Sequence, residues 1–135
     1  MIELSAFTAD HLRVVHIYLC DDVPELRQLL RIILEEDPDL LVVGESGDAQ
    51  IGIEEIAELQ PNVVLLDLSM PGMDGLEALP LIRRAAPGTS VIVFSGFTEA
   101  RMASLVLERG ADRYIEKGEP LERVREAVRE LAISR

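Results

Sequence analysis

Short apolar runs alternate five times with amphipathic segments along this chain, and this order restricts the fold more than any other feature. The apolar runs predict strands, and the segments between them, whose apolar residues recur every three or four positions, predict helices. We expect strands at 14–20, 40–43, 63–66, 91–94 and 112–116, with Gly44 closing the second. We expect helices from Pro24 to the acidic corner at 35–38, and then at 49–59, 76–86, 99–109 and 121–132. Strict alternation implies right-handed crossovers onto one parallel sheet, so the sequence predicts a doubly wound α/β fold.

The run Val63–Leu66 is apolar at every position and stops at Asp67. A strand at the centre of a parallel sheet is covered by helices on both faces, so it shows continuous hydrophobicity instead of alternation. A loop rich in turn residues follows at 69–75. The sequence therefore predicts that Asp67 stands at the carboxyl end of a central strand, the edge at which open α/β sheets place their functional sites.

Composition indicates one globular domain. Of 135 residues, 48% are hydrophobic and 28% are charged, and no apolar run approaches the roughly 20 residues that span a bilayer. A net charge of −12 argues against direct binding to nucleic acid, whose phosphates demand a basic surface. The only cysteine, Cys20, cannot form an internal disulfide, which fits a reducing cytoplasm. We expect the domain at 14–133, preceded by an extension at 1–13 to which the sequence assigns no role.

Chemically active side chains follow four of the expected strands. Asp21 and Asp22 follow the first, Asp67 the third, Ser95 the fourth and Lys117 the fifth. Because the carboxyl ends of parallel strands share one edge of the sheet, three carboxylates and one ammonium should meet there. Crowded carboxylates repel one another unless a cation neutralises them, and Mg²⁺ prefers such oxygen ligands. The sequence therefore predicts a magnesium site beside Asp67.

A bound metal ion would leave one aspartate free to attack a phosphoryl group. The phosphoryl oxygens would then need positive charge from Mg²⁺ and Lys117, and hydrogen bonds from Ser95 and the Gly96 N–H. Lys117 is the only lysine in a chain with 12 arginines, and a compact ammonium binds phosphate as a point charge. Taken singly, these residues also fit solvated loop acids and an ordinary surface charge. Their convergence at one edge favours the chemical interpretation.

Together these residues resemble the receiver domain of bacterial two-component response regulators. The resemblance covers about residues 14–133 and rests on four strings: the pair Asp21-Asp22, the segment from Leu65 through Asp67 to Gly75, Ser95 with Gly96, and the segment from Gly110 through Tyr114 to Lys117. It implies a flavodoxin-like sheet of five parallel strands in the order 2-1-3-4-5. The chain departs from many relatives at Gly118, where they have proline.

The resemblance also implies a role for each residue. Asp67 would accept the phosphoryl group. Asp22, Asp67 and the backbone carbonyl of Ser69 would coordinate Mg²⁺, with Asp21 acting through a water molecule. Ser69 and Phe97 would tune the lifetime of the phosphoaspartate, and the bulky Phe97 would shield it from hydrolytic water.

The implied switch couples two side chains. Phosphate on Asp67 would draw Ser95 toward it, and the vacated space would let Tyr114 rotate inward. This movement would repack the face formed by the fourth helix, the fifth strand and the fifth helix, through which the chain would contact a second copy or an output protein.

The implied partner is a sensor histidine kinase, and the chain would catalyse only its own phosphorylation and dephosphorylation. It would be either a complete single-domain regulator or the receiver part of a helix-turn-helix transcription regulator. Two other functions fit a similar sheet. An aspartate-nucleophile phosphohydrolase usually carries Asp-x-Asp, but Ser69 stands at the second position here. A flavin carrier would need a phosphate-binding loop rich in Ser, Thr and Gly after the first strand, which the sequence lacks.

Overall fold

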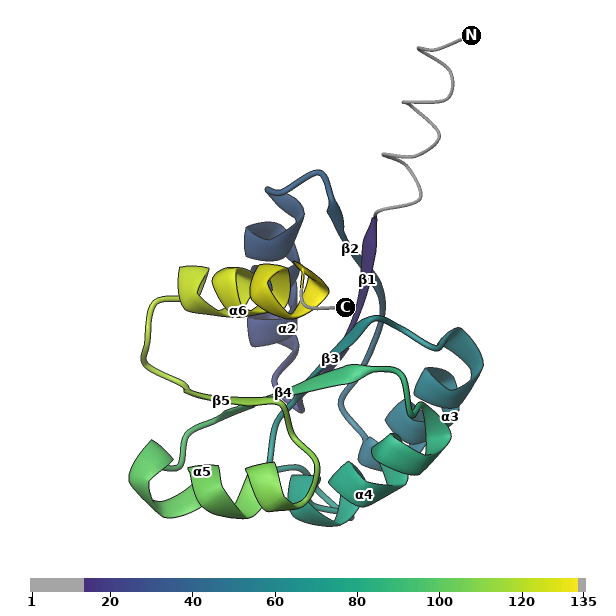
Figure 1. Cartoon of the computed structure of the whole chain (residues 1–135), viewed down its shortest axis with the longest axis vertical. Helices are drawn as coiled ribbons and strands as arrows, with labels where there is room; N and C mark the ends of the chain where they lie inside the picture. The colour runs from purple at the N-terminus through teal and green to yellow at the C-terminus, as the bar shows by residue number, and fades with distance from the viewer. Residues whose placement is uncertain (1–13, 134–135) are drawn as a thin grey trace, which may run out of the picture.

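A computed structural model describes residues 14–133, and it confirms the predicted doubly wound fold (Figure 1). Within these residues, five parallel strands form one sheet in the order β2-β1-β3-β4-β5. The strands are β1 (Val15–Cys20), β2 (Leu40–Ser46), β3 (Val63–Leu66), β4 (Ser90–Ser95) and β5 (Arg113–Glu116). The helices are α2 (Pro24–Glu35), α3 (Ala49–Leu59), α4 (Gly75–Ala85), α5 (Glu99–Glu108) and α6 (Glu122–Ile133). The expected extension at 1–13 lies outside the described residues.

Helices cover both faces of the sheet. In Figure 1, α2 and α6 lie on one face, and α3, α4 and α5 lie on the other. One cluster of buried side chains joins the sheet to α2 and α6 and includes Leu30 and Val124. A second cluster joins the sheet to the other three helices and includes Ile56, Leu79 and Val106. None of the helices in this part of the chain has the length and apolar character that crossing a bilayer requires.

The central strand β3 contributes to both clusters. Val63 and Leu65 belong to the cluster under α2 and α6, whereas Val64 and Leu66 belong to the opposite one. All four side chains are buried, because successive residues of a strand point to opposite faces and each face is covered here. The double burial fixes the strand on both sides, and with it the position of Asp67 at its end.

The expectation that Gly44 closes the second strand is wrong. β2 continues to Ser46, and its register shifts on the way: Val42 pairs with Ile17, whereas Gly44 pairs with Tyr18. The Tyr18 side chain is fully buried, and a Cβ atom on Gly44 would lie only 2.9 Å from one of its ring carbons. Glycine makes room here for the ring on the neighbouring strand, a role that local sequence does not distinguish from a strand end.

Candidate functional site

Backbone hydrogen bonds of the sheet position the residues that follow β1, β3 and β5. The Asp21 N–H donates to the last carbonyl of β2 at 3.0 Å, and the Asp67 N–H donates to the last carbonyl of β1 at 2.9 Å. The Lys117 N–H donates to the last carbonyl of β4 at 2.7 Å. Pairing thus extends one residue beyond each of these three strands, so the three side chains start from a rigid frame at the same edge.

Lys117 lies between two buried carboxylates. Its Nζ atom is 2.8 Å from Asp21 Oδ2 and 3.4 Å from Asp67 Oδ2. The side chains of Asp21 and Asp67 are only 5% and 3% exposed, whereas that of Lys117 is 26% exposed. Asp22 is exposed, and the potential ligand oxygens of the three aspartates lie within 4.8 Å of one another. The structure therefore brings together all four charged residues that the sequence placed at this edge.

Burial and neighbouring charges shift the pKa values of Asp67 and Lys117. Burial raises the pKa of Asp67, and the nearby charge of Asp21 raises it further, although the Ser69 N–H and Lys117 counteract this. Burial of the ammonium lowers the pKa of Lys117, but its hydrogen bonds and attraction to Asp21 and Asp67 outweigh that effect and leave the pKa raised. Lys117 is thus protonated at neutral pH, whereas the surroundings of Asp67 disfavour its ionised form.

The residues present fit a magnesium ion. Three carboxylates face one ammonium, so full ionisation leaves an excess of two negative charges, which one divalent cation would balance. Mg²⁺ usually binds through one or two carboxylates and keeps its remaining positions for water and phosphate oxygens. The exposed Asp22 would receive such an ion from solvent, and the buried Asp67 would hold it beside the end of β3. The ligand roles of Asp22, Asp67 and the Ser69 carbonyl stay predictions, although the oxygens of the two aspartates lie close enough to share one ion.

The loop at 68–74 folds back onto Asp67. The Gly75 N–H donates to the Leu68 carbonyl at 2.9 Å, and a Cβ atom on Gly75 would lie 2.5 Å from the Asp67 carbonyl oxygen. Such a distance excludes any side chain at this position, so the close return of the loop requires glycine. The Ser69 N–H donates to Asp67 Oδ1 at 3.2 Å. The loop thus holds one carboxylate oxygen of Asp67, while Lys117 faces the other.

Ser95 and Tyr114 meet at the loop between β4 and α5. Ser95 is fully buried, and its hydroxyl accepts the Phe97 N–H at 3.3 Å. The Tyr114 hydroxyl donates to the Phe97 carbonyl at 2.5 Å, and its ring packs against the cluster under α3, α4 and α5. The Glu116 carboxylate accepts the Glu99 N–H and ties the start of α5 to β5. The two predicted switch residues are therefore linked through the backbone of Phe97.

A cleft of about 250 Å³ opens beside the phosphoacceptor candidate. Its lining residues are Leu68, Ser69, Met70, Asp74, Leu76, Phe97 and Met102. Phe97 is 47% exposed, and the neighbouring Gly96 is also exposed. Ser69 and Phe97, the two residues predicted to tune the phosphoaspartate, thus line one cleft although they come from different loops.

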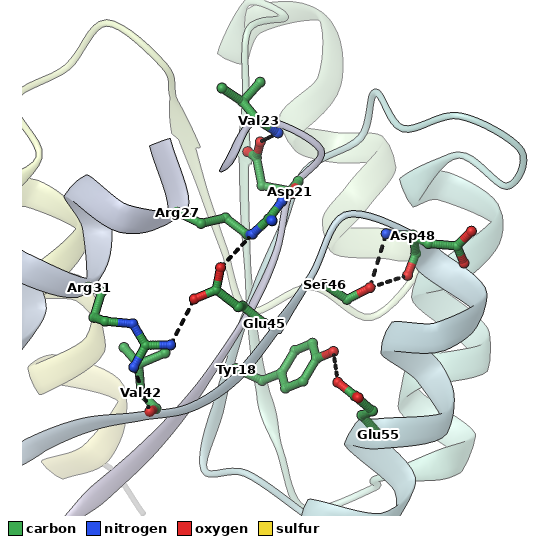
Figure 2. A network of polar contacts seen from close by, with 10 residues as sticks. All are labelled: Tyr18, Asp21, Val23, Arg27, Arg31, Val42, Glu45, Ser46, Asp48 and Glu55. Atoms are coloured by element: carbon green, nitrogen blue, oxygen red, sulfur yellow. Dashed lines mark hydrogen bonds and ion pairs between the residues drawn. The ribbon is translucent and has the colours of Figure 1, made fainter. Parts of the chain in front are cut away.

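Sequence reasoning missed Arg27 and Glu45. Arg27 Nη1 donates to the backbone carbonyl of Asp21, and its Nε donates to Glu45 Oε1 at 2.7 Å (Figure 2). Arg31 donates to the other carboxylate oxygen of Glu45 at 2.7 Å. In the sequence, an arginine on an amphipathic helix is typical of a solvated surface. Nothing local signals that its partners are a main-chain carbonyl and a residue of another strand.

Comparison with known proteins agrees with this geometry. Residues 17–129 match the family model of the response regulator receiver domain. The chain is 41% identical over 101 residues to the nitrate/nitrite response regulator protein NarL of Escherichia coli (strain K12), a match that covers 75% of this chain and 47% of that protein. It is 35% identical over 116 residues to the transcriptional regulatory protein LiaR of Bacillus subtilis (strain 168), covering 86% of this chain and 55% of that protein.

The fold agrees with a solved receiver structure. The response regulator domain of Thermotoga maritima CheB superposes with a TM-score of 0.83 at 30% identity, covering 90% of this chain and 98% of that one. The chain spans about half the length of the two regulators named above. The match over 17–129, with the acidic pair, Asp67 and Lys117 at one sheet edge, shows that the chain belongs to the response regulator receiver domain family of two-component systems.

Proposed function

We propose that this receiver domain is a phosphorylation switch that accepts a phosphoryl group on Asp67 in the presence of Mg²⁺. The position of Lys117 carries the proposal, because its ammonium lies between the carboxylates of Asp21 and Asp67. A cation so placed can bind a phosphoryl oxygen as soon as one is attached to Asp67. Burial of both carboxylates strengthens this attraction, since water screens it poorly there.

The phosphoryl transfer is a nucleophilic displacement at phosphorus. A carboxylate oxygen of Asp67 attacks the phosphorus of a phosphohistidine whose second ring nitrogen is protonated, so that a P–O bond forms and the P–N bond breaks. The electron pair of the broken bond stays with the ring nitrogen, and neutral histidine leaves. Lys117 stabilises the negative charge on the phosphoryl oxygens, and Ser95 and the Gly96 N–H donate hydrogen bonds to them. Bound Mg²⁺ supplies further positive charge to the same oxygens.

The phosphoryl group on Asp67 would act on the loop between β4 and α5. We infer that the Ser95 hydroxyl leaves the Phe97 N–H and donates to the phosphoryl group. Tyr114 is tied to the same loop through the Phe97 carbonyl, so a shift of the loop repositions its ring. The face made by α5, β5 and α6 would then change shape and bind a second copy or an output protein.

We propose a sensor histidine kinase as the phosphodonor and the cytoplasm as the compartment. The similarity to NarL and LiaR supports placing this chain in a transcription regulator, as the receiver part that controls an output domain. Under this proposal, the chain catalyses only its own phosphorylation and dephosphorylation.

Intact mass spectrometry after incubation with a small phosphodonor and Mg²⁺ tests the proposal. We expect wild type to gain the mass of one phosphoryl group, and Asp67→Asn to gain none. Asp39→Asn, at an exposed position before β2, is the matched control and should be phosphorylated as wild type is. Chelation of Mg²⁺ should abolish the gain. A phosphoryl mass that persists in Asp67→Asn would sink the assignment of the acceptor.

A further inference from the structure

We propose that Arg27 is a positioning residue for the metal site: it anchors the peptide group between Asp21 and Asp22 and thereby sets how these two carboxylates meet a divalent cation. The inference rests on the proposed function, because that function supplies the cation. It assigns a role to a side chain that would touch neither the metal ion nor the phosphoryl group.

The contacts of Arg27 join three segments of the chain. Its side chain is 15% exposed and reaches from α2 to the loop after β1, with Glu45 of β2 on its other side (Figure 2). Nη1 donates to the Asp21 carbonyl at 2.5 Å, and Nε donates to Glu45 Oε1 at 2.7 Å. The planar guanidinium offers its donors in a fixed fork, so one group holds both acceptors in a defined geometry.

The Asp21 carbonyl matters because it belongs to the peptide that connects the two acidic residues. The Asp21 side chain has two contacts besides those of Arg27 to its carbonyl, since its Oδ1 accepts the Val23 N–H at 2.9 Å and its Oδ2 lies 2.8 Å from Lys117 Nζ. Asp22, by contrast, has an exposed side chain whose direction depends on the plane of that peptide. By fixing the carbonyl, Arg27 fixes the plane and reduces the freedom that Asp22 would lose on binding a cation.

The loop after β2 encloses the guanidinium. A Cβ atom on Gly47 would lie 3.1 Å from Arg27 Nη1 and 3.5 Å from the Asp22 Cα atom. Arg27 is therefore confined between the loops that follow β1 and β2. This distinguishes it from exposed ion pairs, whose side chains move freely and contribute little.

Arg31 offers a matched control on the same helix. It contacts the second oxygen of Glu45 at 2.7 Å and the Val42 carbonyl at 3.3 Å, and its side chain is 38% exposed. Substitution of either arginine by methionine removes one positive charge and one contact to Glu45. Only Arg27→Met also frees the Asp21 carbonyl.

Two explanations of the role of Arg27, one through its charge and one through its position, predict opposite changes in the affinity for Mg²⁺. If Arg27 acted only through its charge, its removal would relieve repulsion and tighten Mg²⁺ binding. If it positions the acidic pair, its removal weakens Mg²⁺ binding, as the loss of groups that orient metal ligands does. The direction of the change therefore separates the two explanations.

The test measures Mg²⁺ affinity by titration calorimetry and, in metal-free protein, amide hydrogen exchange at Val23 by NMR. For Arg27→Met we expect affinity to fall about 10-fold. We also expect exchange at Val23 to accelerate about fivefold relative to amides of β3, as the loss of one hydrogen bond in the loop implies. Arg31→Met should keep both quantities near those of wild type. Exchange needs no metal ion, so it reports on the loop itself.

The outcomes separate this inference from the proposed function. A wild-type protein that does not bind Mg²⁺ contradicts the proposed function. If wild type binds, the inference is overturned when Arg27→Met binds Mg²⁺ as tightly or more tightly, or when its Val23 exchange equals that of Arg31→Met. Should Arg27→Met fail to fold, Arg27→Lys keeps the charge and most of the stem but offers one nitrogen for both acceptors. It should show a smaller loss in the same direction, and wild-type affinity and exchange in that variant would overturn the inference.

Discussion

Replacing Lys117 by methionine removes the positive charge that lies between Asp21 and Asp67 while keeping an unbranched side chain. Removing one partner of a buried ion pair typically costs about 3–5 kcal/mol, because the other charge is left uncompensated. The two carboxylates are almost fully buried, but the lysine side chain is 26% exposed, so solvent screening reduces the expected cost. We expect a loss of about 2–3 kcal/mol in the free energy of unfolding at pH 7 without Mg²⁺, a discounted value between the buried and exposed cases.

The loss should depend on pH in a defined direction. Burial and the charge of Asp21 raise the pKa of Asp67 above its ordinary value of 3.8, and Lys117 counteracts this, so removing Lys117 raises the pKa further. In the window between 3.8 and that raised pKa, the folded variant holds more protons than the unfolded chain, and its stability falls as pH rises. Wild-type Asp67 titrates in the same way up to its own raised pKa, so the difference from wild type should widen as pH rises above that pKa toward neutrality.

Urea denaturation with EDTA at pH 4.5 and pH 7 measures the difference, and thermal unfolding should show a decrease of about 6–12 °C in Tm at pH 7. Arg101→Met, at an exposed position of α5, is the control and should change stability little. Saturating Mg²⁺ should narrow the difference, because a divalent cation neutralises the same carboxylates. Equal stability of Lys117→Met and wild type at pH 7, or a difference independent of pH, would refute the reasoning.

Three further predictions concern the core and the cleft. Gly44→Ala should lose about 1–3 kcal/mol of unfolding free energy, because its Cβ would overlap the Tyr18 ring. Most of that cost should vanish in a Tyr18→Leu background, and urea denaturation of wild type, the two single variants and the double variant checks this. Burial, with the charges of Asp21 and Asp67, raises the pKa of the Cys20 thiol to about 12, so Cys20 should resist a thiol reagent at pH 8 in native protein and react fully in urea; rapid native reaction would contradict this. Phe97→Ala should shorten the half-life of the phosphorylated protein, measured by the decay of the phosphoryl mass, and a half-life of seconds in wild type would argue against shielding by Phe97.

The elements with strong local signals could be predicted from the sequence. The continuous apolar run Val63–Leu66 predicted a central strand, and the structure has β3 at these residues. The helix predicted at 49–59 has the same bounds as α3. Its start is set by Asp48, whose side chain caps the helix by accepting the Ile51 N–H. Helix periodicity, capping residues and strand hydrophobicity act over a few positions, so a single segment displays them.

The errors and omissions concern contacts between distant segments. Gly44 has the local appearance of a strand end, but the Tyr18 ring on the neighbouring strand decides what it does. Arg27 has the local appearance of a surface charge, but it is largely buried between two loops. Tyr18 has the local appearance of a strand residue, yet its hydroxyl donates to Glu55 of α3 at 2.6 Å (Figure 2).

By itself, the sequence determined that Asp21, Asp22, Asp67 and Lys117 share one edge, because parallel strands joined by right-handed crossovers place all their carboxyl ends on the same side. Only the tertiary structure decided that Lys117 contacts both buried carboxylates and that Arg27 holds the carbonyl between the acidic pair. Strand order assigns residues to an edge, whereas contact distances depend on sheet register, on loop paths and on side-chain packing against segments remote in sequence. Those quantities are settled only when all the segments pack together.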